Sequence, residues 1–407
     1  MKFLSTTALG LALAFGAVAI TGVAAPAVAA KPKVPSLKIS DPVRKLIAGA
    51  QEAMKKNDVA GARGLVDQAK AVASTPDDKY VVSSQLYEVG KALNDQKAQA
   101  EAIAGMLDSG KVPEENQGPF NMALGQLSYM TQDYARAEVA LQNALNLKVN
   151  DPVIFALLAE TKFRLKKGPE AVQLIQSAAD AGEAAGKPIP QEWFARGIAI
   201  GSDAKLADQV AKLSLSWLKA YPSQTHWRDS LLIYRDLRTL DADFNLDLMR
   251  LQRAAGALRG ERDYAELAEA TYIKFPGEAK SIVDKGVADG ALNLAQSRGI
   301  KELADIAATK IAADKASLSK NANNGKLALG TADAYASYGD YASAIEMYRK
   351  ALTLGGVDAN VVNTRLGAAL AQSGQKEEAK KVFATLTGPR ADLGRFWTVL
   401  MDAPPAS

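Results

Sequence analysis

The stretch "ASYGDYASAIEMYRKAL", residues 336–352, decides the fold class of this chain. Gly339 separates two runs of helix-forming residues, and small residues follow it at Ala344 and Ala351. Glycine readily adopts the left-handed backbone conformation in which many helices end. Small residues on one face of a helix let a second helix approach closely. The stretch therefore predicts two antiparallel helices packed together around a turn at Gly339.

The same pattern occurs again immediately downstream. In a 34-residue frame that begins at Gly325, four positions carry small residues or an aromatic ring, and a second frame from Asn360 repeats these residue types. Positions 8, 15, 20 and 24 are Ala332, Gly339, Ala344 and Tyr348 in the first frame and Gly367, Gly374, Ala379 and Phe383 in the second. Two copies in register indicate a repeat rather than one alanine-rich helix.

A second block of this pattern lies upstream, at residues 118–185. Its two copies place Gly125 and Leu141, then Ala159 and Ile175, at positions 8 and 24. A weaker copy begins near Val43. The pattern resembles the tetratricopeptide repeat, a helix–turn–helix unit that stacks on its neighbours. This resemblance implies an all-α, right-handed superhelical solenoid of antiparallel helix pairs, with a concave surface lined by the first helix of each pair.

The resemblance divides the chain into a series of segments. We expect two repeat pairs that match the pattern clearly, at 118–185 and 325–398. Degenerate helical pairs of the same kind are expected at 41–117 and 186–320. Turn signals such as "KKND" at 55–58, "STPDD" at 74–78 and "LGGVDAN" at 354–360 separate the predicted helices. A short tail follows at 399–407, and no run of alternating apolar residues predicts a strand.

The first residues differ from the rest of the chain. Lys2, an apolar run and the small-x-small sequence Ala27-Val28-Ala29 are typical of a secretory signal peptide at residues 1–29, cleaved after Ala29 or Ala30. A flexible leader at 30–40 follows. The alternative is that the segment stays as a membrane anchor, but its apolar run is shorter than the roughly 20 residues of a spanning helix. We therefore expect an exported protein without stable membrane insertion after cleavage.

The composition of the chain limits the cellular compartments and the classes of partner that are expected. The 407 residues include no cysteine and no Asn-x-Ser/Thr sequon, which in an exported chain favours a bacterial periplasmic protein. The formal net charge of +4 is small for this length and gives no indication of nucleic-acid binding. Without cysteine, disulfides and thiolate metal sites are excluded.

Motifs that could carry chemistry are weak. His226 is the single histidine and predicts a structural role at a turn or helix start. Asp241, Asp243, Asn245 and Asp247 alternate as in a calcium loop, but Leu246 stands where that loop needs glycine. We expect Asp241 or Asp243 to cap a helix instead. No catalytic, metal-binding or cofactor-binding residue is predicted, and no cofactor is expected.

The family resemblance implies which residues face the concave groove. Positions 2, 5, 9, 12 and 13 of the first helix usually do so, and the block at 118–185 carries the residue types there that anchor interfaces. The predicted protein-binding residues are Met122, Gln126, Tyr129, Met130, Glu160, Phe163 and Arg164. Packing of Tyr129 and Phe163 against neighbouring helices is the competing interpretation. The same positions in 325–393 are small, and they lack the Lys and Asn pair with which some family members clamp a C-terminal carboxylate.

We therefore predict a non-enzymatic periplasmic scaffold that binds a protein or peptide of unknown identity in its groove, with a role in envelope assembly or secretion. The alternative is an envelope hydrolase, or a polysaccharide-binding protein, that acts on cell-wall glycans. Paired carboxylates on the concave face would be needed for hydrolysis. Cell-wall lytic enzymes with a helical superhelix add a separate catalytic domain, for which the pattern leaves no room.

Overall fold

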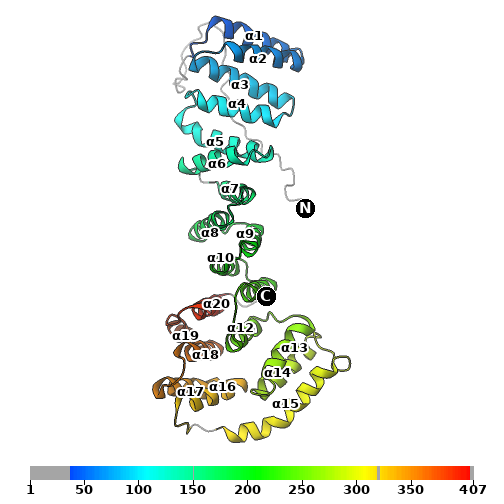
Figure 1. The fold of residues 1–407 in the computed structure, drawn as a ribbon, viewed down its shortest axis with the longest axis vertical. Helices are drawn as coiled ribbons and strands as arrows, with labels where there is room; N and C mark the ends of the chain where they lie inside the picture. The colour runs from blue at the N-terminus through cyan, green and yellow to red at the C-terminus, as the bar shows by residue number, and fades with distance from the viewer. Residues whose placement is uncertain (1–36, 150, 319–320, 404–407) are drawn as a thin grey trace, which may run out of the picture.

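The computed structural model describes residues 37–149, 151–318 and 321–403. In these ranges the chain forms twenty α-helices and no β-strand, so the predicted all-α class is confirmed (Figure 1). The predicted signal peptide, most of the leader and the last residues of the tail lie outside the described residues. The helices stack in pairs along an elongated molecule, which is the architecture of a helical repeat solenoid.

Fifteen helices follow the chain from one end of the molecule to the other. They are α1 (Asp41–Lys55), α2 (Val59–Val72), α3 (Pro76–Ala92), α4 (Gln96–Asp108), α5 (Glu114–Met130), α6 (Tyr134–Asn146), α7 (Pro152–Arg164), α8 (Gly168–Ala184), α9 (Gln191–Asp203), α10 (Ala207–Ala220), α11 (Gln224–Asp236), α12 (Ala242–Ala254), α13 (Gly260–Thr271), α14 (Pro276–Ala288) and α15 (Arg298–Ser317). The last five are α16 (Gly325–Ser337), α17 (Tyr341–Leu354), α18 (Ala359–Gln372), α19 (Lys376–Phe383) and α20 (Pro389–Asp402).

The turns inside seven of the helix pairs share one backbone geometry. Gly339 has a φ of 73° and Gly374 a φ of 81°, which confirms the predicted role of glycine at this position. Five other pairs reach the same left-handed conformation without glycine, at Asn57, Asn94, Gln132, Lys166 and Lys205. In each case the next backbone N–H donates back to the carbonyl five residues earlier. This is the Schellman arrangement that satisfies the last carbonyls of a helix.

Aspartate begins the second helix in four of these pairs. Asp58, Asp95, Asp133 and Asp340 follow the left-handed residue directly, and each side chain accepts a hydrogen bond from the backbone N–H three residues on. Such a cap satisfies one of the free donors of the helix start and stabilises a helix by about 1 kcal/mol. The turn and the cap together define a local signal for a helix pair.

Glycine also permits the closest contacts between paired helices. A Cβ on Gly125 would lie 2.5 Å from Leu141, one on Gly197 would lie 2.5 Å from Leu213, and one on Gly367 would lie 2.4 Å from Phe383. The two residues in each pair are sixteen positions apart, as positions 8 and 24 of the repeat predict. The second of these contacts lies in the segment 186–320, where the repeat pattern is faint in the sequence.

The C-terminal helices do not continue the stack outward. Helix α20 contacts α10 and α12, and α16 contacts α14, so that the chain turns back on itself after α15 (Figure 1). One apolar core accordingly joins residues 211–257 to residues 322–401, and a separate core holds α13, α14 and α15. Simple stacking of successive pairs, which the sequence predicts, therefore ends near α12, and the C-terminal half is a closed arrangement of helices.

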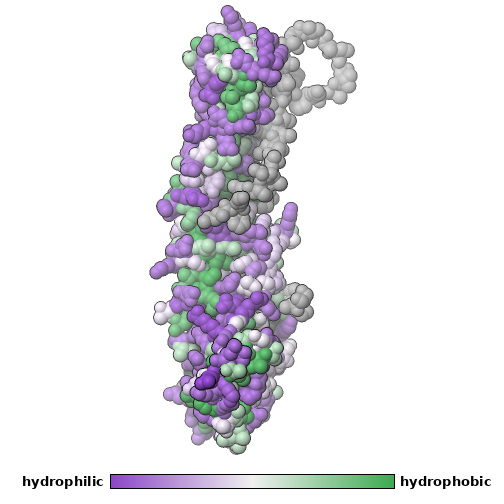
Figure 2. Space-filling view, turned by 90° about the vertical axis from the view of Figure 1, so that its right-hand side faces the viewer, coloured by the Kyte–Doolittle hydropathy of each residue, from purple (hydrophilic) through white to green (hydrophobic). Residues whose placement is uncertain are grey.

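Polar and apolar residues alternate on the surface along the length of the molecule. Figure 2 shows polar residues over most of one face, an apolar patch near the α1 end and an apolar strip that runs from about midway down to the height of α11 in Figure 1. Among the residues placed by the structure, no helix combines the length and apolar character that crossing a bilayer requires.

The glycine contact between α18 and α19 provides a test of the repeat packing. Gly367→Ala should lower the free energy of unfolding by about 1–3 kcal/mol, because the added methyl group overlaps the ring of Phe383. Gly330→Ala is the matched control, since a Cβ on Gly330 meets nothing within 4 Å. It should raise stability by about 0.5–1 kcal/mol, as alanine does in an exposed helix. Urea unfolding measures both, and equal stability of the two variants would contradict the assigned contact.

Candidate functional site

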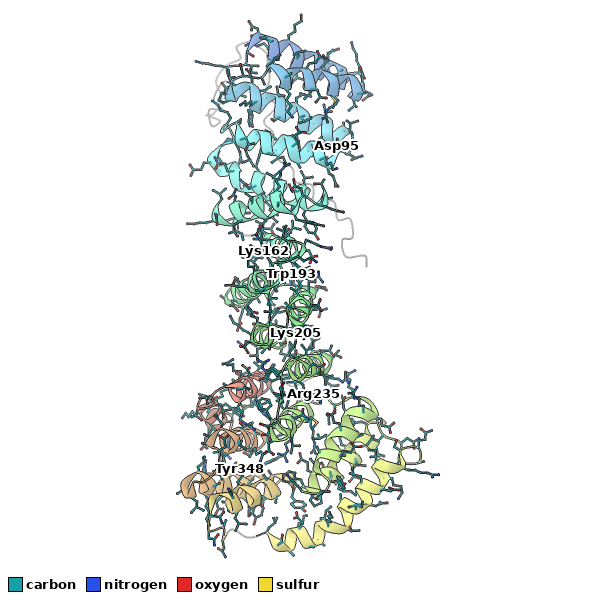
Figure 3. The ribbon with its side chains drawn as sticks, viewed as in Figure 1. Asp95, Lys162, Trp193, Lys205, Arg235 and Tyr348 are labelled. Atoms are coloured by element: carbon teal, nitrogen blue, oxygen red, sulfur yellow. The ribbon has the colours of Figure 1, made fainter. Side chains whose placement is uncertain are left out.

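The predicted groove residues lie on α5 and α7, the first helices of two successive pairs. Four of them, Tyr129, Glu160, Phe163 and Arg164, come together with Arg196 of α9, and we call these five residues the A-helix cluster. Figure 3 shows Lys162 on α7 and Trp193 on α9 in the same narrow middle section of the molecule. The structure therefore brings most of the predicted residues to one place and adds a residue from the next pair.

Glu160 holds the A-helix cluster together. Its carboxylate accepts hydrogen bonds from Arg164 Nε at 3.0 Å and from Arg196 Nε and Nη2 at 2.9 and 3.2 Å. The guanidinium of Arg196 also lies 4.6 Å from the centre of the Phe163 ring, within range of a cation–π interaction. Two arginines share one carboxylate and remain nearly half exposed. The cluster thus offers an aromatic ring and two donors to a partner.

Tyr129 forms the other side of the cluster. Its ring packs edge-on against Tyr134, with the ring centres 5.7 Å apart. Burial, with a smaller contribution from the nearby Glu160 carboxylate, raises the pKa of the Tyr129 hydroxyl above its usual value of 10.0. The hydroxyl is therefore protonated at neutral pH and available as a hydrogen-bond donor.

Three other predicted residues do not join the cluster in the same way. Met122 is wrongly placed by the prediction, because it is 7% exposed and packs among Leu141, Ile154 and Leu158 between the two pairs. Gln126 is half-buried, and Met130 at the end of α5 is 54% exposed. Met130 alone among these three presents a large apolar surface to solvent.

An ion network stiffens the helices behind the cluster. Lys162, which is largely buried, pairs with Glu138 of α6 at 2.7 Å and with Glu170 of α8. Lys167 pairs with the same Glu138 at 2.9 Å. Burial alone would raise the pKa of Glu138, but the hydrogen bonds from the two lysines outweigh it and hold this pKa below 4.5. Three helices are therefore fixed relative to one another beside the cluster.

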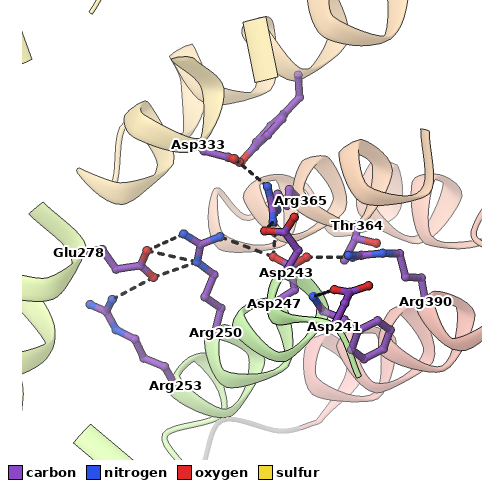
Figure 4. Close-up of polar contacts among 12 residues, drawn as sticks. Asp241, Asp243, Asp247, Arg250, Arg253, Glu278, Asp333, Thr364, Arg365 and Arg390 are labelled. Atoms are coloured by element: carbon purple, nitrogen blue, oxygen red, sulfur yellow. Dashed lines mark hydrogen bonds and ion pairs between the residues drawn. The ribbon is translucent and has the colours of Figure 1, made fainter. Parts of the chain in front are cut away.

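A cluster of buried charges lies where the C-terminal helices return to α12 (Figure 4). Asp247 of α12 is 3% exposed and accepts hydrogen bonds from Arg365 Nε at 3.0 Å and from Arg390 Nη1 at 2.8 Å. Arg365 also pairs with Asp333 of α16 at 2.7 Å. Arg250, one turn after Asp247, donates to Glu278 of α14 at 2.7 Å. We call these six residues the buried charge network.

Within this network the charges are matched, three arginines against three carboxylates. Burial raises the pKa of Asp333 despite the nearby Arg365, while Tyr348 donates a hydrogen bond to it at 2.7 Å. Tyr348 is the aromatic residue at repeat position 24, and Figure 3 places it in the C-terminal block. The aromatic residue of the repeat frame therefore also satisfies a buried carboxylate.

The weak motifs of the sequence have structural roles. Asp241 accepts from Phe244 N at 2.7 Å and caps α12, as predicted, and Asp243 pairs with Arg365 at 3.2 Å. His226 lies in the first turn of α11, with Nδ1 2.7 Å from the Tyr221 carbonyl oxygen and its ring stacked on Trp217. In the described part of the chain, no group of three or more His, Cys, Asp or Glu side chains is arranged to hold a metal ion.

Arg196 is the residue that sequence reasoning missed. The spacing of Gly197 and Leu213, equal to that of Gly125 and Leu141, would have placed α9 in register with α5 and α7. That register puts Arg196 thirty-six residues after Glu160, about one repeat further along. No comparable signal exists for the pairing of Asp247 with Arg365 and Arg390.

These observations define the chain as an all-α helical repeat protein. The model of the tetratricopeptide repeat family matches residues 331–354, the segment from the middle of α16 to the end of α17. This match supports the resemblance seen in the sequence, and it falls within the C-terminal block of the repeat pattern. None of the curated proteins matches the chain.

Several solved structures are similar to this chain, at low sequence identity and low TM-score. A tetratricopeptide repeat protein from Parabacteroides merdae is 16% identical, and the match covers 70% of this chain and all of that one, with a TM-score of 0.26. The Naa15/Naa10 complex bound to HypK-THB is 13% identical over 87% of this chain and 70% of that one, with a TM-score of 0.29. Yeast Tom70 is 12% identical over 88% of this chain and 94% of its own, with a TM-score of 0.23.

The buried charge network makes a prediction about stability. Asp247→Asn should lower the free energy of unfolding by about 3–5 kcal/mol, because Arg365 and Arg390 stay buried without their shared carboxylate. Asp208→Asn is the matched control, since Asp208 is 97% exposed and pairs with Arg238 at the surface. It should change stability by less than about 1 kcal/mol. Calorimetric unfolding compares the two, and an Asp247→Asn variant as stable as the control would refute the assignment.

Proposed function

We propose that this chain is an exported, non-catalytic scaffold that holds another protein against the A-helix cluster. The observation that carries this proposal is the cluster itself, in which Tyr129, Phe163 and Arg196 are partly exposed on the first helices of three successive pairs. Tyrosine and arginine are the residue types that most often dominate protein interfaces. Repeat solenoids present such residues on an extended surface suited to another chain.

The state of the acidic residues favours binding over hydrolysis. A glycosidase needs one carboxyl group free to donate a proton and a second that is free to act as base or nucleophile. Asp247 and Glu278 are instead held by arginines at hydrogen-bond distance, and Asp333 is shared between Arg365 and Tyr348. These three buried carboxylates thus have structural partners.

The periplasm of a bacterium is the compartment that we propose for this scaffold. The support comes from the first thirty residues, with their apolar run and Ala27-Val28-Ala29, and from a chain without cysteine or glycosylation sequon. Assembly or secretion of envelope components is the class of process that we propose for it.

Export is tested directly on the full chain expressed in a bacterium. We expect the protein in the periplasmic fraction, with a mature N-terminus at Ala30 or Lys31 because cleavage follows the small-x-small sequence. Osmotic-shock fractionation and N-terminal sequencing measure this. An intact N-terminus at Met1 in the cytoplasmic fraction would overturn the proposed compartment, while an intact N-terminus in the membrane fraction would support an anchor.

Partner binding is tested by placing a photo-crosslinking amino acid at Phe163 in cells of the source organism. We expect a discrete higher-mass adduct, which disappears when Arg164→Glu and Arg196→Glu remove the donors of the cluster. The same crosslinker at Gln142, on the exposed face of the second helix α6, is the matched control. Adducts of equal mass and yield from both positions, or none from Phe163, would argue against the cluster as the binding surface.

A further inference from the structure

The closed C-terminal half surrounds a cavity that is separate from the A-helix cluster. Its volume is about 760 Å³, and its walls come from α12, α14, α15, α16, α17, α18 and α20. This volume is in the range of sites that hold small molecules or short segments of a partner. Helices from distant parts of the sequence contribute to it, so the cavity exists because the C-terminal helices return to α12.

The side chains that line the cavity carry more positive than negative charge. Five are cationic and three are anionic: Arg250, Arg253, Lys280, Lys315 and Arg365, against Asp247, Glu278 and Asp284. Each of the three carboxylates already has a close cationic partner, at 3.0 Å for Arg365 to Asp247, 2.7 Å for Arg250 to Glu278 and 2.6 Å for Lys280 to Asp284. The excess of two positive charges therefore belongs to Arg253 and Lys315.

Arg253 is only loosely paired. Its Nη1 lies 3.8 Å from Glu278, whose two oxygens already accept hydrogen bonds from Arg250. Its Nη2 donates to the Ser281 hydroxyl at 2.9 Å, and one third of the side chain is exposed. A guanidinium has five donors, so most of the donors of Arg253 remain available for a ligand.

Lys315 faces the cavity from α15. Its ammonium lies 4.8 Å from the centre of the Tyr338 ring, and the side chain belongs to an exposed residue. Tyr338 is held in turn by a hydrogen bond to Asp314 at 2.6 Å and by close contact with Gly277, where a Cβ would lie 2.2 Å from the ring. The aromatic ring is thus fixed, and it positions the ammonium at the cavity wall.

We propose that this cavity binds a carboxylate-bearing ligand, with Arg253 and Lys315 as the two cations that pair with it. Two positive charges in excess of the lining carboxylates, in a partly enclosed space, match a ligand with two carboxylates, since charge-assisted hydrogen bonds are stronger there than in open solvent. An acidic peptide segment and a free dicarboxylate share this chemistry. The site goes beyond the proposed scaffold function and does not depend on the A-helix cluster.

The test uses the full mature chain and two probes. Fluorescein-labelled tetraglutamate is titrated by fluorescence anisotropy, and glutarate is titrated by calorimetry. We expect binding of at least one probe, weakened by about tenfold or more in the Arg253→Gln/Lys315→Gln variant because both cations are lost. The matched control is Arg262→Gln/Lys310→Gln, which removes the same net charge from exposed positions on α13 and α15. It should leave binding within about twofold of the wild type.

The outcomes separate the sources of the ligand. Binding of tetraglutamate alone assigns the cavity to an acidic peptide, and binding of glutarate alone assigns it to a free dicarboxylate. No binding of either probe, an equal loss in the control variant, or equal binding of inorganic phosphate would overturn the proposal. Lys315→Glu alone changes one exposed side chain, so it tests the cavity should the double variant be unstable. Failure to find a crosslinked adduct at Phe163 would count against the A-helix cluster as a binding surface, but it would not change the result expected for the cavity.

Discussion

Asp247 is the residue on which the closed half of the molecule depends. Its carboxylate is 3% exposed and meets Arg365 and Arg390, which follow it by 118 and 143 residues in the sequence. Removing such charges from water costs several kcal/mol for each ion, and only well-formed pairs offset this penalty. Any other placement of α18 and α20 against α12 would leave the buried Arg390 without a carboxylate and Arg365 with Asp333 alone. The network thus selects one arrangement, while the apolar core around Tyr234 and Phe396 supplies the favourable burial.

The sequence predicts the helix pairs well because their signals are local. A turn residue, a capping aspartate and a small residue sixteen positions before a large one all lie within one repeat, as in Gly339, Asp340 and the Ala332–Tyr348 pair. Asn57 and Asn94 carry the same turn signal before an aspartate, so a search that also accepted asparagine would have found the first pairs more clearly. The return of the C-terminal helices has no such signal, because charge pairs between distant helices leave no periodicity in the sequence.

The candidate site shows the same division between local and distant information. Register along a repeat correctly groups Tyr129, Glu160 and Phe163, since successive first helices lie side by side in any such solenoid. The position of a residue in the repeat does not determine how deeply its side chain is buried. Met122 occupies a groove position of the frame but is buried between α5 and α7, because the space next to Leu141 is filled by its side chain. Arg196 was missed because the repeat containing α9 has Gly197 and Leu213 at positions 8 and 24 but Gln209 at position 20, where the other repeats carry alanine.

The two surfaces of the molecule therefore have different physical origins. The A-helix cluster arises from stacking of neighbouring pairs, and it would persist if the C-terminal helices were displaced. The cavity requires α12, α14, α16 and α18 to stay in one arrangement, which the pairs of Asp247, Asp333 and Glu278 maintain. Arg253 stands on α12, which this network holds in place, and it contributes only a long contact to Glu278. Lys315 stands on α15, which carries no member of the network. Charges that position the helices and charges that remain open to a ligand are in this way carried by different residues.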